Sequence, residues 1–138
     1  MTDKYTLQIP ADLQQLARVR RFIQDAGTAL GACKESVEDL ALAIDEAVTN
    51  TIVHGYRGGR GTIAIKVRRS GDAVTVQLRD NAPVFDPTLV SDPDLDIPLE
   101  QRPLGGMGIY LMKNNVDELK YRAIEPGGNE LTLVKKIE

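Results

Sequence analysis

Apolar side chains alternate with polar ones near both ends of the chain and recur at helical spacing between them. Tyr5, Leu7 and Ile9 share one side of an alternating run, which predicts a first strand. A first helix capped by Asp12 follows, and a second helix extends from about residue 36 to 54. The expected core faces of these two helices are Leu13, Leu16, Val19 and Ile23, and then Val37, Leu40, Ala41, Ile44, Val48, Thr51 and Ile52.

The second half of the chain returns to strand-like alternation. Two alternating apolar runs, 63–67 and 74–78, predict a hairpin. A third helix over about 108–116 precedes a closing hairpin over 119–133. Because strands come first and last without repeated βαβ units, we expect an α/β (α+β) two-layer sandwich. It forms one domain, 1–138, with a mixed, mainly antiparallel sheet of about five strands covered on one face by three helices.

The periodic pattern is interrupted once, between about residues 82 and 104. This segment holds five of the seven prolines and a run of five acidic residues. A structureless connection of about twenty residues is uncommon in a compact domain, where it serves as a functional lid or is a disordered linker. Because periodic structure resumes after it, we expect a lid.

Composition narrows the functional classes. The net charge is −3, with scattered basic residues, which argues against a direct nucleic-acid surface. No apolar run approaches the ~20 residues that a membrane span requires, and the first residues lack the apolar core of a signal peptide. The single cysteine, Cys33, excludes an internal disulfide and a cysteine-based zinc cluster, and is expected to be a packing residue. We therefore expect a cytoplasmic protein without a membrane partner.

Glu46 and Asn50 are the most informative pair in the sequence. A helix advances about 100° per residue, so residues four apart stand one above the other, and both project away from the apolar stripe. A carboxylate and a carboxamide in this register can hold a proton acceptor and a metal ligand. In isolation, the same spacing is typical of a solvated polar face.

Asp80 lies where the strand of 74–79 is predicted to end, and it opens the stretch DNAPVFDP. A carboxylate at a strand end can accept a hydrogen bond from an exocyclic amine such as that of adenine. The alternative is an Asp-Asn pair that simply forms a turn.

A glycine-rich run, with Gly105, Gly106 and Gly108, joins the lid to the third predicted helix. Successive backbone N–H groups converge in such a run, and the start of a helix adds partial positive charge, which together suit phosphate oxygens. The alternative is a flexible hinge. The Walker-type and Rossmann-type glycine patterns are not found in the sequence.

Taken in this order, the three motifs resemble the GHKL ATP-binding (histidine kinase-like ATPase) superfamily. Within it, the chain resembles the anti-sigma factor serine/threonine-protein kinases of bacterial sporulation and general stress. DEAVTNTIVHGY at 45–56 is similar to that family's asparagine box, and GGMGIYLM at 105–112 to its second glycine box. The resemblance covers nearly the whole chain.

The resemblance implies roles for individual residues. Glu46 matches the general base, Asn50 the side-chain ligand of Mg²⁺, and Asp80 the adenine-binding aspartate. Gly105, Gly106 and Gly108 match the phosphate-binding loop beside an ATP lid at about 82–104. Arg18 matches an arginine of the first helix that contacts sigma factor and antagonist.

The implied function is that of an anti-sigma factor that uses ATP and Mg²⁺ to phosphorylate a serine of a STAS-type anti-sigma factor antagonist, and that sequesters a sigma factor to regulate transcription. Relatives of this type are commonly homodimers. The alternative is an ATP-binding regulatory module that binds its partner without phosphate transfer, although such a module needs no base at Glu46. Hydrolysis of ATP by water would use the same base. A histidine-kinase catalytic domain is disfavoured, because the single histidine, His54, lies on the nucleotide helix itself.

Two positions depart from the family's pattern. Ala82, followed by a proline, stands where the family often has a glycine after the aspartate. Asn129 stands where many relatives have a threonine. Both departures concern the adenine side of the predicted site.

Overall fold

The computed structural model of the chain describes residues 3–98 and 107–138. Five strands form one sheet in the order β1-β2-β3-β5-β4, and each of its four pairings is antiparallel. The elements within the described residues are β1 (Lys4–Pro10), α1 (Leu16–Ala29), α2 (Lys34–Asn50), β2 (Thr62–Ser70), β3 (Ala73–Asp80), α3 (Met107–Asn114), β4 (Glu118–Ala123) and β5 (Asn129–Lys136). The predicted two-layer sandwich of a five-stranded sheet and three helices is confirmed, and the sheet is wholly antiparallel rather than mixed.

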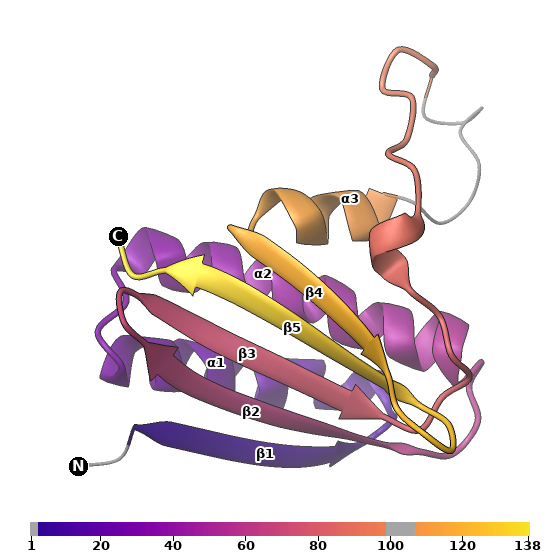
Figure 1. Cartoon of the computed structure of the whole chain (residues 1–138), viewed down its shortest axis with the longest axis horizontal. Helices are drawn as coiled ribbons and strands as arrows, with labels where there is room; N and C mark the ends of the chain where they lie inside the picture. Colours follow the sequence, from indigo (N-terminus) through magenta and orange to yellow (C-terminus); the bar gives the residue numbers. More distant parts are fainter. Residues whose placement is uncertain (1–2, 99–106) are drawn as a thin grey trace.

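The helices form a single layer on one side of the sheet (Figure 1). α2 contacts both α1 and α3, so it is the central helix of this layer. The inward side chains of the strands meet the apolar stripes of the helices, which excludes water from the interface and stabilises both layers. The largest fully buried side chains are Ile9, Ile23, Leu40, Ile44, Ile63, Ile65, Met112, Leu133, Val19, Val48, Val67 and Val74.

The first helical segment begins differently from the prediction. Asp12 accepts a hydrogen bond from the Gln14 backbone N–H, as predicted for a cap, but the capped turn is a short 3₁₀ helix, Leu13–Gln15. The predicted core position Leu13 is wrong, because this turn leaves the Leu13 side chain 47% exposed. The apolar stripe toward the sheet starts only with α1 itself.

The N-terminal cap of α2 was also not predicted. Its cap is Cys33, whose Sγ accepts a hydrogen bond from the Ser36 backbone N–H at 3.4 Å. The expectation that Cys33 is a packing residue is therefore wrong, since the side chain is exposed at a helix end. After Asn50 the helix does not stop but widens into a π-helical turn, Thr51–Gly55.

The predicted lid is described in part. A 3₁₀ turn, Pro87–Leu89, is capped by Asp86, and the segment then extends away from the two layers (Figure 1). Lys113 of α3 holds the segment where it leaves the body, since its Nζ donates to the Val90 carbonyl at 2.7 Å. Gly105 and Gly106 lie outside the described residues.

In the described part of the chain, no helix combines the length and the apolar character needed to cross a membrane.

Candidate functional site

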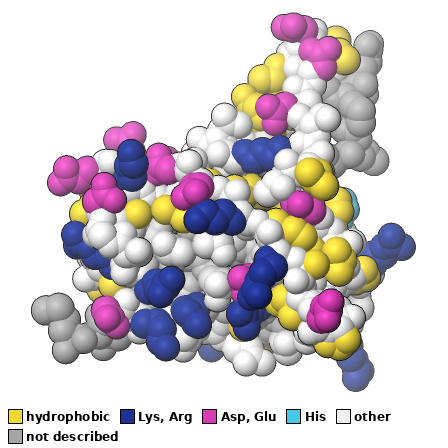
Figure 2. Space-filling view, in the orientation of Figure 1, with side chains coloured by type: hydrophobic (Ala, Val, Ile, Leu, Met, Phe, Trp, Pro, Cys, Tyr) yellow, Lys and Arg dark blue, Asp and Glu magenta, His cyan; other side chains and the backbone are white. Residues whose placement is uncertain are grey.

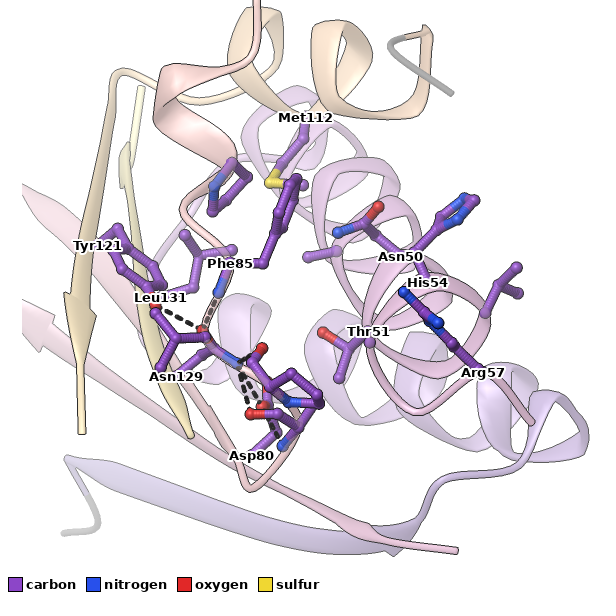
Figure 3. A pocket seen from close by; sticks show the side chains of 17 residues that line it. Asn50, Thr51, His54, Arg57, Asp80, Phe85, Met112, Tyr121, Asn129 and Leu131 are labelled. Carbon is purple, nitrogen blue, oxygen red and sulfur yellow. Dashed lines mark hydrogen bonds between the residues drawn. The ribbon is translucent and has the colours of Figure 1, made fainter. Parts of the chain in front are cut away.

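Two cavities lie side by side at the C-terminal end of α2. The first, of about 430 Å³, is enclosed by the end of this helix, the end of β3 and the inner side of β4 and β5 (Figure 3). The second, of about 800 Å³, lies between α2, the lid segment and the start of α3. Asn50, Val53, His54 and Phe85 line both cavities, so the two are adjoining compartments of one cleft.

The π-helical turn Thr51–Gly55 shapes the wall between the compartments. A π turn inserts an extra residue into a helical turn and is frequent at functional sites. Thr51, Val53 and His54 all line the first cavity together with Asn50 (Figure 3). These four positions are spaced i, i+1, i+3 and i+4, so they lie on one side of the helix.

Asp80 is buried at the sheet end of the first cavity, where it is the last residue of β3 and 8% exposed. Its Oδ1 accepts hydrogen bonds from the Ala82 backbone N–H at 3.0 Å and from the Asn129 amide at 2.9 Å. No described residue forms a hydrogen bond with its Oδ2. No buried side-chain oxygen or nitrogen of the described residues lacks a partner, so Oδ2 is exposed to the cavity rather than buried. One oxygen is thus fixed by the protein while the other is accessible as an acceptor.

Asn129 is the residue that joins Asp80 to the base of the lid. Its register partner on β3 is Asp80 itself. Its Oδ1 accepts from Tyr121 Oη at 2.5 Å and from the Phe85 backbone N–H at 2.9 Å. Its Nδ2 donates to Asp80 and to the carbonyls of Ala82 at 3.2 Å and Pro83 at 3.1 Å. A buried, fully satisfied network of this kind rigidifies its surroundings.

The residue before Asn129 must be glycine for this network to form. Gly128 has φ +117°, and a Cβ there would overlap the Asp80 carbonyl oxygen. Glycine allows both the left-handed backbone and the close approach of the two strands.

Burial raises the pKa of the Asp80 carboxyl above its ordinary value, and the hydrogen bonds from Asn129 and Ala82 oppose the shift in part. Because Oδ1 already accepts two hydrogen bonds, a proton would sit on Oδ2. Protonation therefore converts the accessible acceptor into a donor.

Glu46 lines the second cavity, one helical turn before Asn50. No described residue forms a hydrogen bond or ion pair with its carboxylate. Burial raises the pKa of Glu46, and the neighbouring negative charge of Asp45 adds to the shift. A Cβ on Gly108 would lie 2.8 Å from Glu46 Oε2, so the glycine brings the first turn of α3 against the carboxylate.

Asn50 faces both cavities, and no described residue hydrogen-bonds its side chain. Mg²⁺ binds through one or two protein oxygens and keeps several waters or substrate phosphate oxygens. A single free carboxamide oxygen fits this mode of binding. The described residues contain no group of three His, Cys, Asp or Glu side chains that would form an all-protein metal site.

Comparison with known proteins identifies the family. The model of the histidine kinase-like ATPase domain matches residues 9–135. The chain belongs to this family. Serine-protein kinase RsbW of Bacillus cereus (strain Q1) is 30% identical over 122 residues, covering 86% of this chain and 76% of the relative. RsbW of Listeria monocytogenes serovar 1/2a is 30% identical over 125 residues, covering 87% and 80%.

A solved structure has the same fold. The crystal structure of the RsbU and RsbW domains of Rv1364c from Mycobacterium tuberculosis superposes with a TM-score of 0.67 at 21% identity. The superposition covers 98% of this chain and 32% of that longer one. The histidine kinase-like ATPase fold therefore extends over nearly all of the chain.

Four of the predicted site residues of this ATPase domain meet in the cleft: Glu46, Asn50, Asp80 and Gly108. Arg18 does not, since it is exposed on α1, where its guanidinium lies 3.4 Å from Gln15 Oε1.

Sequence reasoning missed three contributors to the cleft, namely Phe85, Tyr121 and the π-helical turn. It noticed Asn129 only as a departure from the family pattern. The structure shows that Asn129 donates a hydrogen bond to Asp80. Ala82, the other departure, donates a hydrogen bond to Asp80 from its backbone N–H. Both residues that depart from the family pattern therefore hydrogen-bond the Asp80 carboxylate.

Proposed function

We propose that this chain is an ATP-dependent protein-serine kinase and anti-sigma factor. It phosphorylates a serine of a STAS-type anti-sigma factor antagonist and sequesters a sigma factor. The observation that carries the proposal is the position of Glu46 and Asn50, one turn apart on α2, at a two-compartment cleft with a buried aspartate at its far end. The RsbW relatives, named as serine-protein kinases, support the reaction class.

ATP enters this cleft with its adenine toward Asp80. The exocyclic amine of adenine donates to the free Oδ2, while guanine would present a carbonyl there and leave two acceptors facing each other. An unpaired buried acceptor is strongly disfavoured, so the site selects ATP over GTP. The triphosphate then lies toward the second cavity, near Asn50 and the start of α3.

The phosphate end uses Asn50, Mg²⁺ and the glycine run. Asn50 would hold Mg²⁺, and the bound ion would neutralise charge on the phosphate oxygens. In this proposal Gly105, Gly106 and Gly108 bind the phosphates through backbone N–H groups. Of the three, Gly108 is described, in the first turn of α3, which is the positive end of that helix. Phe85 and the lid exclude water from the compartment.

Glu46 acts as the general base. It accepts the proton of the substrate serine while the serine oxygen bonds to the γ-phosphorus, and the bond from that phosphorus to the bridging oxygen breaks to release ADP. Such a base contributes roughly 10²–10⁴-fold to the rate. The raised pKa of Glu46 supports this role, because a base works best when its pKa approaches the working pH.

The proposed partners are proteins. Arg18, exposed on α1 away from the cleft, contacts the sigma factor and the antagonist. The protein works in the cytoplasm as a homodimer, without direct contact to nucleic acid or membrane.

Incubation of the purified chain with γ-labelled ATP, Mg²⁺ and candidate STAS proteins tests the proposal. We expect label on one serine of the cognate STAS protein, absent when that serine is replaced by alanine. ATP binding without label on any candidate would favour the alternative, a regulatory module that transfers no phosphate. Release of free phosphate without labelled protein would instead identify hydrolysis by water.

A further inference from the structure

The sheet surface opposite the helices is unevenly charged. Over the whole chain, 20 acidic residues outnumber 17 basic ones. On β1–β3, however, the outward positions between residues 4 and 79 include four Lys or Arg and no Asp or Glu. Dark blue side chains gather on this part of the surface (Figure 2). We call it the basic face, formed by Lys4, Thr6, Gln8, Ala64, Lys66, Arg68, Thr75, Gln77 and Arg79.

Three of the four cations of the basic face have no ion-pair partner among the described residues. Lys4 and Arg68 are direct partners across β1 and β2, an arrangement in which like charges destabilise a sheet. No described carboxylate forms an ion pair with Lys4, Lys66 or Arg68. Arg79 contacts Glu130 at 2.6 Å, but that single carboxylate also pairs with Arg122 at 2.8 Å. Positive charge is therefore in excess.

A shallow groove of about 280 Å³ runs across the same strands. The smallest side chain that lines the groove is that of Ala64, which lies between its register partners Gln8 and Arg79. Thr6, Gln77 and Lys66 also line it. The groove thus offers hydroxyl, amide and cationic groups to one bound segment.

We propose that the basic face binds an acidic segment of a partner protein. Charge complementarity is the reason, since Asp and Glu side chains would neutralise Lys4, Lys66 and Arg68, while the amides of Gln8 and Gln77 bond the segment's backbone. The face lies on the far side of the sheet from α2 and the cleft, so it is accessible whether or not nucleotide is bound. This proposal does not depend on the kinase reaction.

Two other occupants fit less well. A second copy placed face to face would bring the same cations together, which like-charge repulsion opposes. Single-stranded nucleic acid binds sheet surfaces by stacking bases on aromatic side chains, and the basic face contains none.

Fluorescence anisotropy with short labelled peptides tests the proposal. The probe is an alternating Glu-Ser peptide of about eight residues, long enough to cross three strands spaced ~4.8 Å apart. A Gln-Ser peptide of the same length and an oligothymidylate are the comparison probes. We expect the full chain to bind the Glu-Ser peptide at low salt, more tightly than either comparison probe, with affinity falling as salt rises.

Charge reversal then locates the binding site. Lys66→Glu with Arg68→Glu should weaken Glu-Ser binding by on the order of tenfold, since it replaces two attractions with two repulsions. The matched control, Lys34→Glu with Arg60→Glu, changes net charge equally on exposed positions elsewhere and should leave the affinity within about twofold. Lys66→Ser with Arg68→Ser should give an intermediate loss.

Several results would overturn the proposal: no binding of the Glu-Ser peptide to the unaltered chain, equal losses in face and control variants, or tighter binding of the oligonucleotide. Amide resonances give an independent readout, because peptide-induced shifts should appear on Thr6, Gln8 and Gln77. Shifts confined to α1 or the lid segment would contradict the location. ATP binding should be unchanged in both charge-reversed variants, so a failed kinase assay leaves this test intact.

Discussion

The two compartments of the cleft are built in opposite ways. In the first, Asp80 and Asn129 are buried and hydrogen-bonded to each other, to Tyr121 and to the start of the lid. In the second, Glu46 and Asn50 project from one helix face without a described hydrogen-bond partner. The hydrogen bonds of the first compartment form within the protein itself. The second presents side chains whose partners, in the proposed function, are the phosphates, Mg²⁺ and the substrate hydroxyl.

This difference separates recognition from chemistry. A buried carboxylate with one oxygen held and one accessible distinguishes bases without rearrangement, because its geometry is fixed by the sheet. A general base or a metal ligand acts more readily when it has no hydrogen bond within the protein. Such a bond would have to break before the residue could accept a proton or bind the ion. Substitutions in the first compartment should therefore alter nucleotide affinity with or without Mg²⁺. Those in the second should alter transfer, or only the part of the affinity that depends on Mg²⁺.

The largest effect is expected for Glu46→Gln. It keeps the shape of the side chain and removes the proton acceptor, so transfer to a STAS protein should fall about 10²–10⁴-fold while ATP affinity is retained. Single-turnover transfer and equilibrium titration measure the two quantities separately. Glu38→Gln, an exposed change two turns earlier on α2, is the control and should leave both unchanged. Equal losses of binding and transfer in Glu46→Gln would remove the distinction between the compartments.

Asp80→Asn should reduce ATP affinity by roughly 10–100-fold, the effect of losing one buried charged acceptor. Discrimination of ATP from GTP should weaken with it. The pKa of Asp80 is raised, so ATP binding by the unaltered chain should decline as pH falls through a value above that of an ordinary aspartate. Titrations across pH check this, and the Asp80→Asn variant should lack that decline. Unchanged ATP-to-GTP discrimination would contradict adenine recognition by Asp80.

The same pKa shift has a consequence for stability. A carboxyl whose folded pKa lies above its unfolded value favours the folded state when protonated, and this contribution is lost as pH rises through the folded pKa. Asp80→Asn should therefore not destabilise the nucleotide-free protein at neutral pH. Chemical denaturation with and without ATP distinguishes this from general damage.

Asn129→Ala should lower the free energy of unfolding by about 1–3 kcal/mol, because it leaves the Tyr121 hydroxyl and the Phe85 backbone N–H without their acceptor. ATP affinity should fall several-fold as Asp80 loses one of its two donors. Denaturant titration measures the first effect. An unchanged unfolding free energy would show that the network does not hold the base of the lid.

Gly108→Ala is expected to have the smallest effect. The added Cβ would lie 2.8 Å from Glu46 Oε2, so the flexible carboxylate must shift, and transfer should fall a few-fold. Helix propensity favours alanine by roughly 0.5–1 kcal/mol, so stability should not fall. Gly127→Ala, where a Cβ has no neighbour within 4 Å, is the control. Full transfer by Gly108→Ala would place the productive carboxylate elsewhere.

The sequence predicted the local structure well, including which residues share one side of the central helix. Period-two alternation located the strands, and helical spacing placed Glu46 and Asn50 on one side of α2, because both patterns depend only on near neighbours. The Asn129 network joins β5 to a segment 44–49 residues earlier, and no local pattern encodes such a contact. The π-helical turn was not predicted because it is the last turn of the helix, where few residues follow to reveal the change of phase of about 100° that an inserted residue causes. Leu13 was misassigned because the chain enters α1 through a tighter turn.

The most direct test of the central claim is ATP titration of the unaltered chain and Asn50→Ala, each with and without Mg²⁺. If Asn50 holds the ion between the compartments, Mg²⁺ should strengthen ATP binding to the unaltered chain and have little effect on the variant, while adenosine binds both equally. An undiminished Mg²⁺ effect in Asn50→Ala would contradict the claim that one face of α2 joins metal, phosphate and base in this cleft.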